Sequence, residues 1–314
     1  MKYQSTTSSL LLLTLLSALK VHSSPIVSSS PHCKDFKIPI SISTSNLAFG
    51  LPKFTTNFDV ANFIDTISSR NASTAATVVA GNRQNVSATY FISGTFCQPR
   101  SPHSTRGITD EEGQGETVLI ATHGLNFDKS YWDPEIEKEK YSFVNFAVNQ
   151  GYSILFYDRL GVGMSQRVSG YIPQLGNQVA ILEELIKLVK EGKFIETPQR
   201  KKVVLVGHSF GSAISLNLVA QDPDLVDGVV LTGFSLNATA NNLLGFVEGV
   251  APRIASQQNG KRWGGLDTVS FFFFFIFPLL SMRLNWEINT DLTCLIQGYL
   301  TPVDIYSNVA SYVI

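Results

Sequence analysis

The sequence predicts an α/β fold with a mostly parallel sheet and helices on both faces. Residues 117–122, 203–206 and 228–232 form short apolar runs without charged residues, as strands buried on both faces should. Between the first two runs, residues 179–189 repeat their apolar positions with helical spacing. Strands that alternate with helices in this way indicate right-handed βαβ units around a parallel sheet.

The second apolar run ends in the most informative motif of the chain, Gly207-His208-Ser209-Phe210-Gly211. A Gly-x-Ser-x-Gly motif between a strand and a helix predicts a nucleophile elbow, with the serine hydroxyl exposed at the helix N-terminus. Glycine at both ends of the motif allows the strand and the helix to approach closely. The alternative interpretation is a Gly-rich turn without chemistry.

The other elements follow from local patterns. Two early strand-like segments, residues 35–43 and 86–96, are expected to form an antiparallel edge of the sheet, where one face can meet water. Gly192 is placed to end the helix that carries the apolar repeat. The strand-like segments are residues 35–43, 86–96 and 152–157, and short helices are expected at residues 60–69 and 141–148.

Length and charge restrict the class of protein. The chain has 314 residues, enough for one α/β domain of ordinary size or two small ones. Its formal net charge of −1 argues against a nucleic-acid partner, which requires clustered Lys and Arg. The five histidines show no metal-ligand spacing, so we expect neither a metal nor another cofactor.

The first residues resemble a targeting segment. A basic start, an apolar core at residues 10–16 and small residues after it predict a secretory signal peptide at residues 1–23. The apolar core is too short to span a bilayer, so a membrane anchor is the weaker alternative and no stable membrane span is expected. We expect a Ser/Pro-rich linker at residues 24–34 and one domain at residues 35–314.

Secretion gives meaning to two further features, and the expected location is extracellular. Asn71, Asn85 and Asn237 each begin an N-glycosylation acceptor sequence. Cys33 and Cys97 lie beside the two early strand-like segments, so a disulfide that links adjacent strands is expected in an oxidising compartment, and the third cysteine is left over.

Three motifs in order carry a resemblance to a family: His123-Gly124, the Gly-rich turn that begins at Asp158, and the elbow around Ser209. Over roughly residues 35–265 the chain resembles secreted serine α/β-hydrolases of a kind common among fungi. The resemblance implies that Ser209 attacks an acyl carbon of a small-molecule ester, amide or lipid and forms a covalent intermediate. It also implies an oxyanion hole made by the backbone N–H groups of Phe210 and Leu125.

The resemblance assigns supporting roles to the remaining motif residues. His123 would support the backbone of the oxyanion turn, and His208 would point away from the nucleophile, so neither is expected to be the general base. Asp158 and Arg159 would brace the Gly-rich turn, with Asp158 as the triad acid left as an alternative. Gly207, Gly211 and Gly124 would allow the close backbone approaches.

One departure from the family concerns the base. In this fold the acid and the histidine follow the elbow, whereas no histidine follows His208 in this sequence. We therefore expect that the final strands are missing and that the chain is C-terminally truncated. The alternative function is a catalytically inactive α/β-hydrolase-like protein. The substrate and the oligomeric state stay open.

Residues 234–314 are expected to be a lid-like or irregular insertion after the strand that follows the elbow. Within it, the phenylalanine run at residues 271–275 fits a hydrophobic lid helix and is too short for a membrane span. A third hypothesis is a translated intron at residues 269–297, which would remove Cys294 and leave an even pair of cysteines. A transcript that retains these codons would exclude it.

Overall fold

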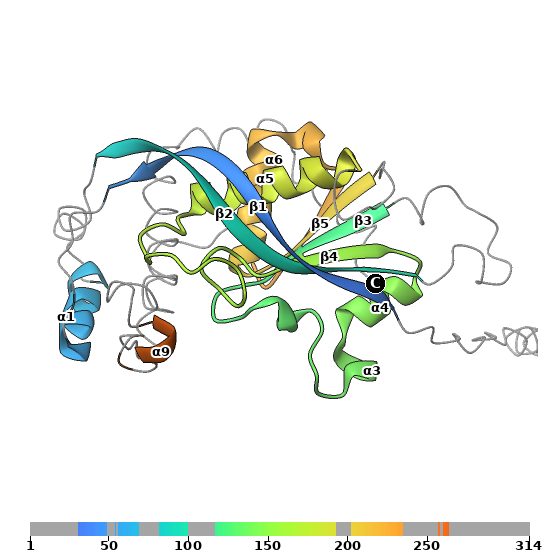
Figure 1. Cartoon of the computed structure of the whole chain (residues 1–314), viewed down its shortest axis with the longest axis horizontal. Helices are drawn as coiled ribbons and strands as arrows, with labels where there is room; N and C mark the ends of the chain where they lie inside the picture. The colour runs from blue at the N-terminus through green and yellow to red at the C-terminus, as the bar shows by residue number, and fades with distance from the viewer. Residues whose placement is uncertain are drawn as a thin grey trace, which may run out of the picture.

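A computed structural model describes residues 31–48, 54, 56–68, 82–99, 117–192, 202–234, 257 and 260–263. Within these residues one sheet has the strand order β1-β2-β4-β3-β5-β6 (Figure 1). The strands are β1 (His32–Leu47), β2 (Arg83–Gln98), β3 (Thr117–Thr122), β4 (Ser153–Tyr157), β5 (Lys202–His208) and β6 (Gly228–Thr232).

The sheet combines a parallel centre with an antiparallel edge, as the sequence predicts. Strands β4, β3, β5 and β6 run parallel to one another. Strand β1 pairs with β2, and β2 with β4, in antiparallel fashion. Every residue of β3 and β4 is buried, which explains their uninterrupted apolar runs.

Helices cover both faces of the sheet. Figure 1 shows α5 and α6 on one side and α4 with α3 on the other. This arrangement is an α/β-hydrolase fold. The helical elements are α1 (Asn57–Ser68), η2 (Lys129–Tyr131), α3 (Lys138–Tyr141), α4 (Phe143–Asn149), α5 (Leu175–Lys190), α6 (Phe210–Gln221), η3 (Pro223–Leu225) and α9 (Gly260–Trp263).

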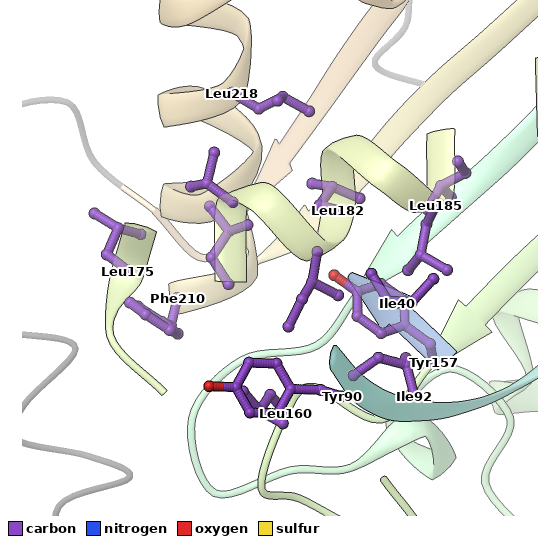
Figure 2. Packing of buried hydrophobic residues seen from close by; sticks show 14 of the residues in the cluster. Ile40, Tyr90, Ile92, Tyr157, Leu160, Leu175, Leu182, Leu185, Phe210 and Leu218 are labelled. Carbon is purple, nitrogen blue, oxygen red and sulfur yellow. The ribbon is translucent and has the colours of Figure 1, made fainter. Parts of the chain in front are cut away.

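Two apolar clusters lie on opposite faces of the sheet. The larger one joins the β1–β2 hairpin to α5 and α6, and Figure 2 shows Ile40, Ile92 and Leu185 within it. The smaller one packs α4 against the other face, around Trp132 and Val144. Full burial of one such side chain contributes about 1.5–3 kcal/mol, so both layers hold the sheet in place.

The observed boundaries differ from the predicted ones mainly in the first two strands. Both strands extend beyond their predicted limits, so Cys33 and Cys97 lie inside strands rather than just outside them. The helix predicted at residues 141–148 begins at Phe143, because the hydroxyl of Ser142 caps it by accepting the Asn145 N–H at 2.9 Å. Gly192 has a φ of 66° and follows α5, in agreement with the prediction.

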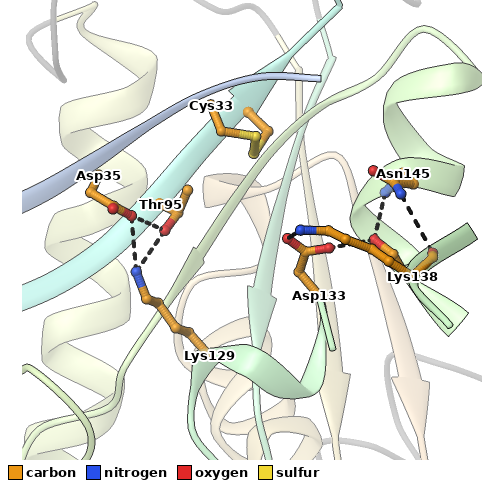
Figure 3. The surroundings of a disulfide bond; sticks show 9 residues. Cys33, Asp35, Thr95, Lys129, Asp133, Lys138 and Asn145 are labelled. Carbon is orange, nitrogen blue, oxygen red and sulfur yellow. Dashed lines mark hydrogen bonds and ion pairs between the residues drawn. A yellow bond between two sulfur atoms is a disulfide. The ribbon is translucent and has the colours of Figure 1, made fainter. Parts of the chain in front are cut away.

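The predicted disulfide is present between Cys33 and Cys97 (Figure 3). The two residues face each other across β1 and β2, with their Cα atoms 4.1 Å apart. Beside the bridge, the Lys129 ammonium bonds to Asp35 at 3.0 Å and to Thr95 at 2.7 Å. The hairpin is therefore tied both to itself and to the loop after β3.

Several predictions lie outside the described residues. They are the signal peptide at residues 1–23, most of the linker, nearly all of the region 234–314 including the segment 269–297, and the acceptors Asn71 and Asn237.

Candidate active site

Ser209 lies at a sharp turn between β5 and α6. Its backbone angles are φ 52° and ψ −115°, a conformation that a residue with a Cβ rarely adopts. Such strain costs about 1–3 kcal/mol and persists only where the surroundings impose it. Here the Ser209 N–H donates to the Thr232 carbonyl at 2.8 Å, which fixes the turn against β6.

The two motif glycines are required by close contacts. A Cβ placed at Gly211 would lie 2.0 Å from the Thr122 carbonyl oxygen. At Gly207 it would lie 2.5 Å from the Cα of Ser212. Both distances are far below any normal contact, so the strand, the helix and β3 meet here without space for a side chain.

The His-Gly loop after β3 flanks the elbow. A Cβ at Gly124 would lie 3.0 Å from the Cβ of Ser209, so this backbone passes directly beside the serine. Next to it, the Gly124 carbonyl accepts hydrogen bonds from His123 Nδ1 at 2.8 Å and from Arg159 Nη2 at 3.1 Å. Because the C=O and N–H of a trans peptide point in opposite directions, the Leu125 N–H points away from these two donors.

His123 bonds to this backbone. The ring is fully buried, and its Nε2 accepts the Arg159 N–H at 3.2 Å while its Nδ1 donates to Gly124. Burial, together with the nearby Arg159 charge, holds the pKa of His123 well below its usual range. The ring is therefore neutral, with both nitrogens occupied, and has no free position for a proton from Ser209.

His208 is engaged on another side of the site. Its ring stacks on Tyr131 with centroids 4.5 Å apart, and Phe127 approaches at 6.1 Å. The hydroxyl of Thr232 donates to the Gly207 carbonyl at 2.9 Å, so His208 Nδ1 is the donor in its 3.1 Å bond to that hydroxyl. Burial lowers the pKa of His208.

Asp158 braces the Gly-rich turn after β4. Its carboxylate accepts the N–H groups of Lys129 and Met164, each at 2.9 Å. Gly163 has a φ of 52°, and a Cβ there would lie 2.3 Å from the Asp158 carboxyl carbon. Burial raises the pKa of Asp158, partly opposed by these two hydrogen bonds. Among the described residues no histidine bonds to Asp158, so the triad-acid alternative gains no support.

The described residues do not supply a general base for Ser209. No described residue hydrogen-bonds to its hydroxyl, which lies at the start of α6 beside the free N–H of Phe210. The structure places Gly124, which precedes Leu125, beside Ser209, with Gly207 and Gly211 in close backbone contacts at the same turn. It adds Thr232, whose contacts with the elbow arise between neighbouring strands and are not revealed by local patterns. The side chain of Arg159, expected to brace the Gly-rich turn, instead bonds to the Gly124 carbonyl and lies over the ring of Phe210.

A separate cleft of about 700 Å³ lies beside the Gly-rich turn, and Ser209 is not among its lining residues. It is lined by both positive and negative side chains, among them Lys37, Asp128, Lys129 and Arg167. In the described part of the chain, no group of three or more His, Cys, Asp or Glu residues is placed to hold a metal ion.

No helix within the described ranges has the length and apolar character needed to cross a membrane.

Parts of the chain are similar to known proteins. Residues 140–262, which include the Gly-rich turn and the elbow, match the family described as serine aminopeptidase, S33. The protein named "Putative carbamate hydrolase RutD" from Agrobacterium fabrum is 29% identical over 40% of this chain and 40% of its own length. Protein ABHD8 from Mus musculus is 29% identical over 44% of this chain and 30% of its own length.

A solved α/β hydrolase from Novosphingobium aromaticivorans is 14% identical over 59% of this chain and 58% of its own, with a TM-score of 0.37. The chain thus spans less than half the length of the curated relatives described above. The family match and these relatives agree with the α/β-hydrolase fold of the sheet.

Proposed function

We propose that the protein is a serine hydrolase that cleaves a carboxylic ester, or a related amide or lipid, through an acyl-enzyme on Ser209. The observation that supports this most strongly is the strained turn at Ser209, with φ 52°, between β5 and α6. A turn without chemistry would have no need to keep a serine in a conformation that favours glycine.

The reaction would proceed in two displacements. The Ser209 oxygen attacks the acyl carbon and gives its proton to a base, and the carbonyl oxygen becomes negatively charged. The N–H groups of Phe210 and Leu125 would donate to this oxyanion. As the intermediate collapses, the base returns the proton to the leaving oxygen, so the neutral alcohol departs and the acyl-enzyme forms. Water then attacks the acyl carbon and gives a proton to the base, which passes it to the Ser209 oxygen as the acid leaves.

The base in this scheme would have to come from outside the described residues. His123 and His208 both use Nδ1 in hydrogen bonds within the site, and neither bonds to Ser209. This observation also favours the second candidate, an α/β-hydrolase-like protein without turnover. A triad serine without its base retains only the residual catalysis of binding and the oxyanion hole.

We also propose that the protein is secreted and glycosylated. The Cys33–Cys97 bridge fits an oxidising compartment, and Asn85 is exposed on β2, where a glycan has room. Expression in a secreting eukaryotic host followed by N-terminal sequencing tests the cleavage near residue 23. A mass shift on glycosidase treatment that becomes smaller in Asn85→Gln tests that acceptor.

The activity is tested by treating the full chain with a fluorophosphonate probe and with p-nitrophenyl acetate. We expect labelling and weak turnover, because no described base activates the serine. Both should disappear in Ser209→Ala and persist in Ser41→Ala, a matched change of an exposed serine on β1. A folded, unlabelled wild-type chain would exclude the hydrolase and favour the inactive alternative.

A further inference from the structure

Arg159 is a buried cation without a described counter-ion. Its side chain is 1% exposed, and neither Nε nor Nη1 has a hydrogen-bond partner among the described residues. Burial lowers the pKa of Arg159 to about 10, so the side chain is still charged at neutral pH. An unpaired charge in the interior is costly. Because the buried charge does not stabilise the fold, a function of Arg159 is to be sought in its contacts.

The contacts of Arg159 converge on the two residues assigned to the oxyanion hole. Its Nη2 donates to the Gly124 carbonyl, which belongs to the same peptide unit as the Leu125 N–H. Its guanidinium lies over the ring of Phe210, 5.0 Å from the centroid. Its backbone N–H donates to His123 Nε2, which directs the Nδ1 proton of that ring to the same carbonyl.

We propose that Arg159 is a positioning residue that sets the orientation of the Gly124–Leu125 peptide and thereby aims the Leu125 N–H at the oxyanion. The inference rests on the proposed serine-hydrolase function. A donor to the carbonyl fixes the opposite direction of the N–H, since the peptide unit is planar. A positive charge at the carbonyl end also polarises the peptide, which strengthens the N–H as a donor.

This role differs from a structural one in its energetic signature. A buried charge without a partner carries a desolvation cost, and an apolar side chain of similar length removes that cost. Arg159→Met should therefore keep the fold while it weakens the control of the peptide. In this variant the Gly124 carbonyl still accepts the bond from His123 Nδ1. We therefore expect the loop to stay folded and only the orientation of the Gly124–Leu125 peptide to become less fixed.

The kinetic test uses the full chain and a fluorophosphonate probe. For Arg159→Met we expect kinact to fall about 10- to 100-fold, less than the loss of a whole oxyanion donor. The apparent KI should change less than about 3-fold because binding of the probe does not need the oxyanion donor. Arg159→Lys should restore part of kinact, and Arg167→Met, an exposed cation after the same turn, should leave it unchanged.

A structural readout keeps the inference separate from the proposed function. Crystal structures of Ser209→Ala with and without Arg159→Met show the Gly124–Leu125 peptide without any need for activity. A rotated peptide in the double variant supports the positioning role even if the wild-type chain is unlabelled, a result that would count against the hydrolase alone. An unmoved peptide overturns the inference, and so does a rotated peptide with an unchanged kinact.

Discussion

The elbow and the β1–β2 hairpin are held in different ways. At the elbow, three backbones meet so closely that a Cβ at Gly211 would lie 2.0 Å from the Thr122 carbonyl oxygen. In the hairpin, the strands pair over 16 positions and are joined by a covalent bridge and by side-chain bonds such as Ser41 to Thr89 at 2.8 Å. The conformation of the elbow thus depends on close packing of backbones, whereas the stability of the β1–β2 hairpin depends on a disulfide cross-link.

The difference determines which substitutions each region tolerates. At the elbow, one added methyl group would overlap neighbouring backbone atoms. These atoms cannot move away without shifting a whole strand. On the hairpin, many side chains are exposed, and their replacement changes little. We therefore expect large effects from the smallest changes at the elbow, and large effects on the hairpin only where the bridge is lost.

The largest effect is expected from Gly211→Ala. In an ordinary helix this change stabilises by about 1 kcal/mol, but here the contact with Thr122 reverses the sign. We expect a loss of about 5 kcal/mol in the free energy of unfolding, measured by urea denaturation. Gly228→Ala is the matched control, because its Cβ would only reach Val204 at 3.6 Å. Equal stabilities of the two variants would contradict the tight elbow.

The next effect concerns the bridge. Cys33→Ala combined with Cys97→Ala opens a loop with a sequence separation of 64 residues. The chain-entropy estimate for such a loop is about 4 kcal/mol, so unfolding should shift to much lower urea. Ser41→Ala should change stability by less than about 0.5 kcal/mol. A double cysteine variant as stable as the wild type would show that pairing of the strands alone suffices for the edge.

The same comparison explains what could be predicted from sequence. The elbow was predictable because Gly207 and Gly211 flank one serine within five residues, so the motif reports a local backbone constraint. The parallel centre was predictable because both faces of its strands are buried. The bond from Arg159 to the Gly124 carbonyl joins residues 35 positions apart, and only the packed sheet brings them together.

Contacts that hold the β1–β2 hairpin on α5 also could not be predicted from local sequence patterns. Asn177 interrupts the apolar stripe of α5, and its side-chain oxygen accepts the amide of Asn46 at 2.9 Å. It also accepts the hydroxyl of Thr44. These partners lie more than 130 residues away in sequence, so the pattern of the helix alone could not show that a buried polar contact holds the hairpin there.

A third prediction uses the buried imidazole near the elbow. The pKa of His123 is well below its usual range in the folded protein, so below about pH 6.5 the unfolded chain takes up a proton that the folded chain does not. Its contribution is complete above pH 6.5 and falls as the pH decreases, with a slope of up to about 1.4 kcal/mol per pH unit. Between pH 6.5 and 5 we expect the free energy of unfolding to decrease, by at most about 2 kcal/mol at the limiting slope.

His208 acts in the same direction, because burial lowers its pKa as well. Asp158 acts in the opposite direction and at lower pH, since its raised pKa favours the folded state below the titration range of that carboxyl group. Urea denaturation at several pH values gives the slope, and ¹⁵N NMR of the imidazoles assigns it. A His123 ring that becomes protonated in the folded protein near pH 6.5 would contradict the buried, neutral assignment.

The smallest effect separates strain from chemistry at Ser209. The angles φ 52° and ψ −115° match the first central position of a type II′ turn, where glycine is favoured. Ser209→Ala removes the nucleophile and keeps the strain, whereas Ser209→Gly removes both. Part of the relief is offset by the greater freedom of glycine in the unfolded chain. We expect Ser209→Gly to be more stable than Ser209→Ala by about 1 kcal/mol in urea denaturation. If Ala were the more stable of the two, the turn would not be strained, and the main support for a functional serine would be lost.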